Sequence, residues 1–458
     1  MKHLILGNGP AGVIAAETLR KADPNCDIMM VGAEAEPPYS RMAIPYLLEG
    51  NIDESGTYLR KDDGHYTTKK ITNKQGMAQS VDTEAKQVTF ADGSVESYDK
   101  LLIATGSHPI RPPIPGIDLP NVHTCWTLND ARAIAASVGP GKRVVQVGAG
   151  FIGCIILEAL AKRGVDLTVV ELGDRMVPRM MTGEAGGMIK SWVENKGVRV
   201  VTEAKVERID GSGSSAPAQS GGGIIGAIKN LFGAGESAPT AVTQSGDEMV
   251  VTLSTGEKIA CDLVIMSAGV RPNTAFLEGS GIKSGNGILT DLHMQTSAQD
   301  VYAAGDVVEA PDMFTGAPMV SAIQPNAADT ARIAALNMAG RPVAHSGILA
   351  INVLDTLGLI SSSFGAWEGV EGGEGVEYAE AKAHKYISLQ FKGDVLVGAT
   401  SVGLTQHVGV LRGLIQGKVK LGHWKEILMN DPLRATEAYL ACSQKPGVLA
   451  NADRSLNA

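Results

Sequence analysis

The chain has 458 residues, which is too long for one ordinary core and indicates two or three domains. Hydrophobic residues make up 44% and charged residues 19%, a composition typical of a globular protein with enough apolar material for buried parallel sheets. The formal net charge of −9 and the lack of a basic stripe argue against nucleic acid as a partner and favour small molecules or proteins.

The sequence shows no targeting signal and no cysteine spacing typical of a disulfide framework or a metal site. No leader precedes the first predicted strand, and no apolar run approaches the ~18 residues of a spanning helix, so we expect a cytoplasmic protein. We interpret each cysteine as a small buried apolar residue and expect neither a structural disulfide nor a metal site. The five cysteines are scattered and have no metal-ligand spacing: Cys26, Cys125, Cys154, Cys261 and Cys442.

The chain opens with an apolar strand, residues 1–6, that runs into a GxGxxG turn and then an apolar-periodic helix. The next apolar run, residues 28–31, is followed by the acid Glu34. Glycines at this spacing allow a tight turn and let the helix N-terminus approach a pyrophosphate, while the acid accepts hydrogen bonds from ribose hydroxyls. The unit predicts a dinucleotide site made by Gly7, Gly9, Pro10, Ala11, Gly12 and Glu34.

Turn-rich and proline-rich segments separate this unit from the next. Pro38-Tyr39-Ser40-Arg41 is predicted to be a turn, and an apolar strand near residues 98–104 ends at Thr105-Gly106. The stretch 109–120 is then interpreted as a linker because it is rich in proline.

A second complete unit follows the linker. The apolar run 144–147 enters a turn with Gly148, Gly150, Phe151, Ile152 and Gly153, and the next apolar run ends at Glu171. A lone GxGxxG is weak evidence, but two units of strand, turn, helix, strand and acid indicate two dinucleotide sites. Two dinucleotides in one chain indicate that electrons pass between them.

Two further strand ends and a change in residue composition complete the pattern. The run 262–268 ends at Gly269, and the run 300–304 ends at Gly305-Asp306. From about His345 the chain has β-branched, alternating runs such as 386–391 and 395–399, which predict a separate α+β domain.

One segment belongs to neither unit. Residues 210–246 are rich in Gly, Ser, Ala and Pro and surround a short apolar stretch, residues 224–232, with helical spacing. This short helix is a candidate docking element for a partner or a membrane surface; the alternative is that it packs back on its own domain.

The order of these motifs resembles the FAD-dependent pyridine nucleotide-disulfide oxidoreductase superfamily. The similarity is to its branches without a redox disulfide: rubredoxin- and ferredoxin-reductase-like enzymes and the flavin part of assimilatory nitrite reductase. It covers residues 1–209 and 249–440, through both glycine turns, the Pro-Tyr-Ser-Arg turn, residues 104–106, 269–273 and 302–306.

The resemblance implies an α/β fold with two Rossmann-like dinucleotide-binding domains and a C-terminal α+β dimerisation domain. FAD would bind residues 1–118 and 275–340, through the first turn, Glu34, Arg41, Thr105, Gly106 and Asp306. NAD(H) would bind residues 119–274, which carry the insertion 210–246, through the second turn, Glu171 and Gly269. Residues 341–445 would form the interface of a homodimer, and residues 446–458 a tail.

Three departures from the family pattern limit which residue roles can be carried over to this chain. Residues 41–46 contain no cysteine, so transfer from flavin to a disulfide is excluded there. Tyr46 stands where ferredoxin-reductase-like members often carry a lysine near the flavin N5. Ile155 replaces a common glutamate that can contact the nicotinamide carboxamide, and Glu158 lies one helical turn further on.

The expected function is a flavoprotein that passes electrons from NADH through FAD to an external acceptor: a redox protein, a metal ion, a quinone or dioxygen. FAD carries the redox chemistry, so no catalytic acid or base is assigned. The alternative is a flavin-containing electron-transfer subunit of a larger redox complex. A nucleotide sensor without turnover is the weakest possibility, because residues 302–306 complete a flavin motif.

Overall fold

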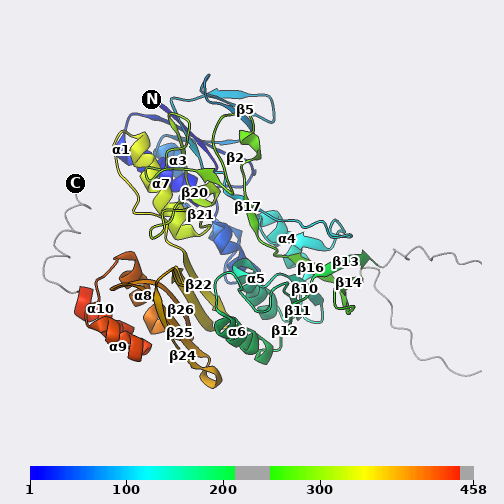
Figure 1. Cartoon of the computed structure of the whole chain (residues 1–458). Coiled ribbons are helices and arrows are strands. Elements are labelled where there is room, and N and C mark those ends of the chain that lie inside the picture. The colour runs from blue at the N-terminus through cyan, green and yellow to red at the C-terminus, as the bar shows by residue number, and fades with distance from the viewer. Residues whose placement is uncertain (212–247, 444–458) are drawn as a thin grey trace, which may run out of the picture.

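The computed structural model describes residues 1–211 and 248–443. These residues form a mixed α/β structure with two five-stranded parallel sheets, a five-stranded antiparallel sheet near the C-terminus, and smaller sheets that connect them (Figure 1). None of the helices in these ranges is long and apolar enough to cross a membrane.

The first parallel sheet is built around strands that are almost wholly apolar. Its order is β19-β7-β1-β2-β3, with every neighbouring pair parallel, and Leu4 and Ile5 of the central strand are fully buried. Helices α1 and α7 contact each other beside this sheet. The elements are β1 (Lys2–Leu6), α1 (Pro10–Ala22), β2 (Asp27–Gly32), β3 (Ile71–Gln75), β7 (Lys100–Ile103), β19 (Val301–Ala303) and α7 (Gln324–Met338).

The second parallel sheet repeats this arrangement with the order β12-β11-β10-β16-β9. A capping box of Thr127 and Asp130 begins α4, and the Thr182 hydroxyl caps α6. The elements are β9 (Val122–Thr124), α4 (Leu128–Ser137), β10 (Arg143–Val147), α5 (Phe151–Lys162), β11 (Asp166–Val170), α6 (Gly183–Asn195), β12 (Arg199–Val201) and β16 (Leu263–Met266).

The antiparallel sheet has the order β22-β23-β26-β25-β24. The predicted strand runs 386–391 and 395–399 lie in its β25 and β26. The elements here are β22 (Ile351–Thr356), β23 (Leu359–Gly365), β24 (Glu374–Glu380), β25 (Lys385–Lys392), β26 (Val395–Val402), α8 (Val408–Gln416), α9 (Trp424–Asn430) and α10 (Ala435–Ser443).

This antiparallel sheet packs against the helices of the second parallel sheet. Strand β22 contacts α5, and Leu354 lies in one hydrophobic cluster with residues of α5 and α6. The Thr182 hydroxyl donates to the Tyr386 hydroxyl at 3.0 Å, and the Trp192 indole donates to the Leu357 carbonyl at 3.1 Å. Each of these contacts joins residues more than 150 positions apart.

Short strands and helices complete the described structure. Strands β8 and β17 pair antiparallel and link the two parallel sheets. The remaining strands are β4 (Ala78–Asp82), β5 (Gln87–Phe90), β6 (Val95–Ser97), β8 (Ser107–Pro109), β13 (Val206–Gly211), β14 (Met249–Leu253), β15 (Lys258–Cys261), β17 (Val270–Pro272), β18 (Ile288–Leu289), β20 (Val308–Pro311) and β21 (Pro318–Val320). The short helices include η1 (Arg41–Ala43), α2 (Ile44–Leu48), α3 (His65–Thr68) and η4 (Gly305–Val307).

Strand β13 extends two residues into the predicted insertion. Asp210 and Gly211 belong to β13, because they pair with Val250 and Met249 of β14 in an antiparallel ladder. The predicted helix at 224–232 and the tail 446–458 lie outside the described residues. The domain boundaries drawn from the sequence stay predictions.

Candidate functional site

The first glycine turn joins β1 to α1 and contains two glycines that cannot be replaced without a clash. Gly7 has φ +111°, and a Cβ there would lie 2.1 Å from the Ala104 carbonyl oxygen. A Cβ on Gly12 would lie 1.9 Å from the Gly7 oxygen. Gly9 is different, because nothing lies within 4 Å of a Cβ built there. The outer glycines serve packing, whereas the middle one leaves open space where a phosphate could approach.

The second glycine turn, between β10 and α5, has the same division of roles. Gly148 has φ +104°, and its Cβ would lie 2.4 Å from the Ser267 oxygen. The Cβ of Gly153 would lie 2.4 Å from the Gly148 oxygen, while Gly150 faces open space. Phe151 and Ile152 begin helix α5, as Pro10 and Ala11 begin α1. The two turns therefore match in geometry as well as in sequence.

Sheet order brings the other predicted residues to the same edges as the turns. All strands within each five-stranded parallel sheet run in one direction, so their carboxyl ends lie together. In the first sheet this edge carries the first turn, Glu34, Thr105 and Asp306. In the second it carries the second turn, Glu171 and Gly269. The crevice at such an edge is where open parallel sheets bind ligands.

Glu34 is held by the Pro-Tyr-Ser-Arg turn. The Tyr39 hydroxyl donates to its carboxylate at 2.7 Å, and Arg41 Nη2 donates at 2.6 Å. Arg41 also donates to the Trp126 carbonyl, and its guanidinium lies 5.3 Å from the centroid of a Trp126 ring. Trp126 in turn donates its indole hydrogen to the Ser107 carbonyl. The sequence pointed to Glu34 and Arg41 separately, but no motif singled out Trp126 or Ser107.

Asp306 lies next to the first turn. Gly305 has φ +80°, and a Cβ there would come within 3.0 Å of the Ala11 side chain. The Ser107 hydroxyl lies 3.4 Å from the Asp306 carboxylate, and burial raises the pKa of this carboxyl. The side chain stands at the carboxyl edge of β7 and β19, where a bound group could hydrogen-bond to it.

Thr105 and Gly106 are fixed by a residue from the far side of the second unit. Asn273 Nδ2 donates to the Thr105 carbonyl at 2.8 Å, and the Thr105 hydroxyl donates to the Asn273 carbonyl at 3.0 Å. The Asn273 amide donates to the Gly106 carbonyl at 2.9 Å. Gly269 is linked to the same region, because its carbonyl accepts from the Ile110 amide. These bonds connect the edges of the two parallel sheets.

Glu171 is buried, with 8% of its surface exposed, and both oxygens are engaged. One accepts from the Ala149 amide of the second turn at 2.6 Å, and the other accepts from the Gly173 amide at 2.8 Å. The acid therefore orders the turn besides standing where a ribose would bind. Arg175, the nearest arginine in sequence, donates to the Met181 carbonyl and to Asp174, so its guanidinium is already committed.

The structure shows the surroundings of the residues that depart from the family pattern. Met42 and Tyr46 are 46% and 55% exposed, directly after Arg41. Ile155 is part of α5 and packs on the hydrophobic cluster there. Glu158 accepts from the Leu357 amide and pairs with Lys162, so it faces the antiparallel sheet rather than the second turn. Cys26, Cys125, Cys154 and Cys261 are buried free thiols, and Cys442 is partly buried.

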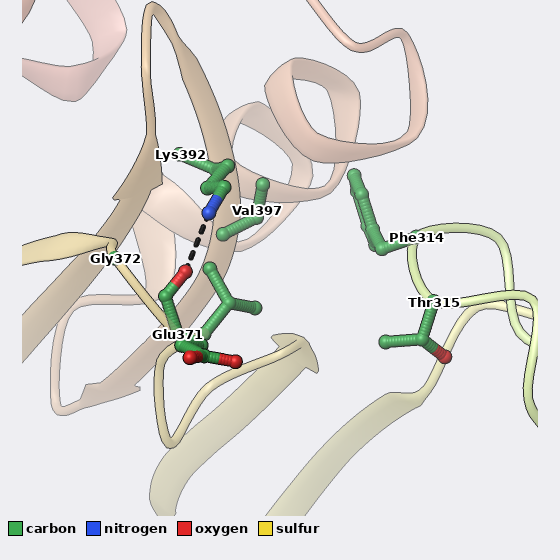
Figure 2. A pocket seen from close by; sticks show the side chains of 7 residues that line it. Phe314, Thr315, Glu371, Gly372, Lys392 and Val397 are labelled. Carbon is green, nitrogen blue, oxygen red and sulfur yellow. Dashed lines mark hydrogen bonds between the residues drawn. The ribbon is translucent and has the colours of Figure 1, made fainter.

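The cavity drawn in Figure 2 lies away from both turns. It measures about 560 Å³ and opens between the β20–β21 connection, with Phe314 and Thr315, and the antiparallel sheet. Lys392 supplies the cation nearest to it, but its ammonium donates to the Glu371 carbonyl. No converging set of polar groups forms there, and we assign the cavity no role.

The comparisons with known proteins agree with this geometry. Residues 1–331 match the family described as pyridine nucleotide-disulphide oxidoreductase. The chain belongs to this family. It is an NAD(P)H-dependent flavoprotein oxidoreductase, with FAD and NAD(H) as cofactors, that passes electrons to an external acceptor. The function and cofactors expected from the sequence are thereby confirmed.

Individual relatives cover much or all of the chain. The epsilon subunit of the NADH-dependent phenylglyoxylate dehydrogenase of Aromatoleum evansii is 30% identical and spans 94% of this chain and 95% of its own length. The probable ferredoxin reductase CtmF of Castellaniella defragrans is 30% identical over 74% of this chain and 76% of its own. A solved covalent complex of putidaredoxin reductase with putidaredoxin has the same fold, with TM-score 0.82 and 21% identity over 97% and 99% of the two chains.

Proposed function

We propose that the crevice at the edge of the first sheet holds FAD. The open space over Gly9 would admit the pyrophosphate, with Gly7, Pro10, Ala11 and Gly12 shaping the turn. Glu34 would accept from the adenosine ribose while Arg41 keeps it in position, and Thr105, Gly106 and Asp306 would line the opposite side. FAD, when bound, supplies the acceptance of a hydride and the release of electrons. The matched open spaces at Gly9 and Gly150 are the observation that carries the proposal.

The edge of the second sheet would hold NAD(H), with the pyrophosphate over Gly150 and the ribose at Glu171. Phe151, Ile152 and Gly153 begin the helix whose N-terminal amides favour an anion, and Gly269 lies across the crevice. Glu171 carries a negative charge that would repel a 2′-phosphate, and Arg175 is engaged elsewhere. We therefore expect NADH to be preferred over NADPH.

A matched pair of glycine variants tests the flavin site. Gly9→Ala adds a methyl group that the empty turn accommodates, so the variant should fold but bind FAD at least tenfold more weakly. Gly7→Ala should instead reduce stability, since its methyl group collides with the backbone and φ is +111°. Bound FAD after gel filtration and the thermal unfolding midpoint separate these effects. Full flavin content in Gly9→Ala would contradict the proposed site.

For the acceptor, we infer a small redox protein. The similarity to a ferredoxin reductase and the shared fold with a reductase bound to putidaredoxin support this inference. Residues 41–46 offer no thiol, so electrons would leave the flavin directly. Reduced protein should be reoxidised by a ferredoxin or a rubredoxin at least tenfold faster than by dioxygen in stopped-flow absorbance. Equal or faster reoxidation by dioxygen would favour an oxidase.

A second candidate is an electron-transfer subunit of a larger dehydrogenase. The observation that favours it is the match over nearly the whole length of both chains to a dehydrogenase subunit. Co-purification of further subunits from the native source, at a size above that of a dimer, would support it. A stable homodimer through residues 341–445, with full turnover on a small redox protein, would favour the first candidate. The homodimer, the cytoplasmic location and docking through residues 224–232 stay predictions.

A further inference from the structure

A group of three side chains with metal-binding chemistry lies at the end of the first sheet opposite the glycine turn. His3 is near the start of β1, Asp23 follows the last residue of α1, and Cys26 precedes β2. One ligand atom from each, an imidazole nitrogen, a carboxylate oxygen and the thiol sulfur, lies within 4.8 Å of the other two. The nucleotide-binding features all lie at the carboxyl ends of the strands, so this cluster is separate from the flavin site.

His3 is buried without a hydrogen-bond partner. Its side chain is fully buried, and neither Nδ1 nor Nε2 has a partner within residues 1–211 and 248–443. Leaving a buried polar nitrogen unpaired is unfavourable, and such groups are rare in native structures. An imidazole nitrogen without a hydrogen-bond partner is free to serve as a metal ligand.

We propose that His3, Asp23 and Cys26 bind one zinc ion. Nitrogen, sulfur and oxygen ligands together suit Zn²⁺, whose bonds to them are about 2.0–2.3 Å long in a tetrahedral set with a fourth position for water. Asp23 is the partly exposed member, and its Oδ1 accepts from the Asn25 amide at 3.0 Å, which leaves its other oxygen for a metal. Binding releases the thiol proton of Cys26 to solvent, and the sulfur–zinc bond takes its place.

The surroundings of Cys26 are suited to a metal-bound thiolate. The Cys26 thiol donates to the Asp23 carbonyl at 3.1 Å, a bond that metal binding would replace. Arg20 Nη1 lies 3.7 Å from the sulfur and also donates to the carbonyl oxygens of Pro24 and Cys26, so its position is independent of the thiol. A donor fixed beside the sulfur would stabilise the thiolate in the manner of outer-sphere hydrogen bonds at metal sites. The Lys100 ammonium is directed to the Tyr302 ring, 5.8 Å from its centroid.

The position of the cluster gives the ion a structural role. It would join β1, the end of α1 and the connection to β2, which together carry the first glycine turn and Glu34 at their other ends. Zinc should therefore stabilise the folded flavin-binding region without changing the rate at which NADH reduces the flavin. The spacing of these residues in the sequence does not indicate a metal site. His3 and Asp23 lie twenty positions apart in the chain and meet only when β1 and α1 pack together.

The test uses the complete flavoprotein, first stripped of metal with a chelator and desalted. Titration with Zn²⁺ against a chromophoric chelator, with metal content measured by plasma mass spectrometry, should give one zinc per chain. Cys26→Ser and His3→Gln should each weaken zinc binding at least tenfold, and Asp23→Asn should weaken it less. Zn²⁺ should raise the unfolding temperature of the wild type and leave that of Cys26→Ser unchanged.

Two control variants exclude binding elsewhere. Cys442→Ser removes the thiol that is not buried, and His345→Gln removes another histidine whose pKa is lowered by burial. Both should bind zinc as the wild type does. Failure of the wild type to retain zinc, equal affinity in Cys26→Ser, or equal loss in Cys442→Ser would each overturn the proposal. If His3→Gln does not fold, the comparison of wild type, Cys26→Ser and Asp23→Asn still decides whether the cluster binds zinc.

Discussion

Glu171 and Glu34 occupy equivalent positions in the two units, yet their surroundings differ. Glu34 is held by side chains, Tyr39 and Arg41, whereas Glu171 is held by two backbone amides and is more deeply buried. A ribose bound at Glu171, as proposed, would share oxygens that already order the second turn. We therefore expect replacement of this acid to affect both nucleotide choice and the shape of the turn.

The nicotinamide preference should depend on the charge of Glu171. Glu171→Gln keeps one of the two acceptor oxygens for the turn and removes the repulsion of a 2′-phosphate, so the ratio of kcat/KM for NADH over NADPH should fall on the order of tenfold, or about 1.4 kcal/mol. Steady-state kinetics with both nucleotides measure it. Glu184→Gln, at an exposed acid in the first turn of α6, is the control. An unchanged ratio would place the discrimination elsewhere.

Asp306 should matter for flavin retention more than for folding. Asp306→Ala removes a half-buried carboxylate that has only a long contact to Ser107, so the apoprotein should lose little stability. Its FAD content after gel filtration should drop by more than half, since the carboxylate is predicted to bond the flavin's ribityl or pyrophosphate region. Asp329→Ala, at an exposed position on α7, should keep full flavin. Normal flavin content in Asp306→Ala would exclude this role.

At the scale of elements, the insertion interrupts a hairpin. Gly211 of β13 pairs with Met249 of β14, so the two ends of the segment between them are adjacent. Closing a loop between adjacent ends costs little free energy, and this cost changes only slowly with the length of the loop. The insertion can therefore be removed without moving the strands that flank it.

A four-residue glycine-rich turn in place of residues 212–247 should leave flavin binding and reduction by NADH unchanged. If the segment docks a partner, turnover with the physiological acceptor should fall severalfold in the same variant. Stopped-flow reduction and coupled acceptor assays measure the two properties. Loss of soluble expression would show instead that the segment packs on its own domain.

At the scale of the whole molecule, burial keeps three of the thiols from forming thiolates. Burial raises the pKa of Cys125, Cys154 and Cys261 to about 12, so these thiols carry almost no thiolate at neutral pH. Residues 41–46, which follow the Pro-Tyr-Ser turn, contain no cysteine. We therefore expect electrons to pass from the flavin to the acceptor without a thiol pair.

Anaerobic titration with dithionite should consume two electrons per FAD. A variant with all five cysteines replaced by alanine or serine should still reoxidise its flavin at the wild-type rate, provided that circular dichroism shows it folded. Uptake of four electrons, or slowed flavin reoxidation in the folded variant, would reveal a redox-active thiol pair.

The sequence by itself determined the local elements and the family of chemistry. Gly7, Gly12, Gly148 and Gly153 are required by close backbone contacts within a few residues or at the adjoining strand, so their spacing carries the geometry of both turns. The buried strands were recognisable because parallel sheets covered on both faces demand continuous apolar runs. Propensity, periodicity and turn chemistry are all local properties, and local properties can be read along the chain.

Only the tertiary structure decided how these parts meet. The bonds of Asn273 to Thr105, of Arg41 to Trp126 and of Trp192 to Leu357 depend on strand order and on how the sheets pack, which no local pattern encodes. The same holds for the start of the insertion, where pairing with β14 extends β13 to Gly211. It holds for His3, whose meeting with Asp23 and Cys26 requires the complete strand–helix–strand unit. Contacts across large sequence separations form only when the whole core assembles. The sequence pattern therefore did not predict them.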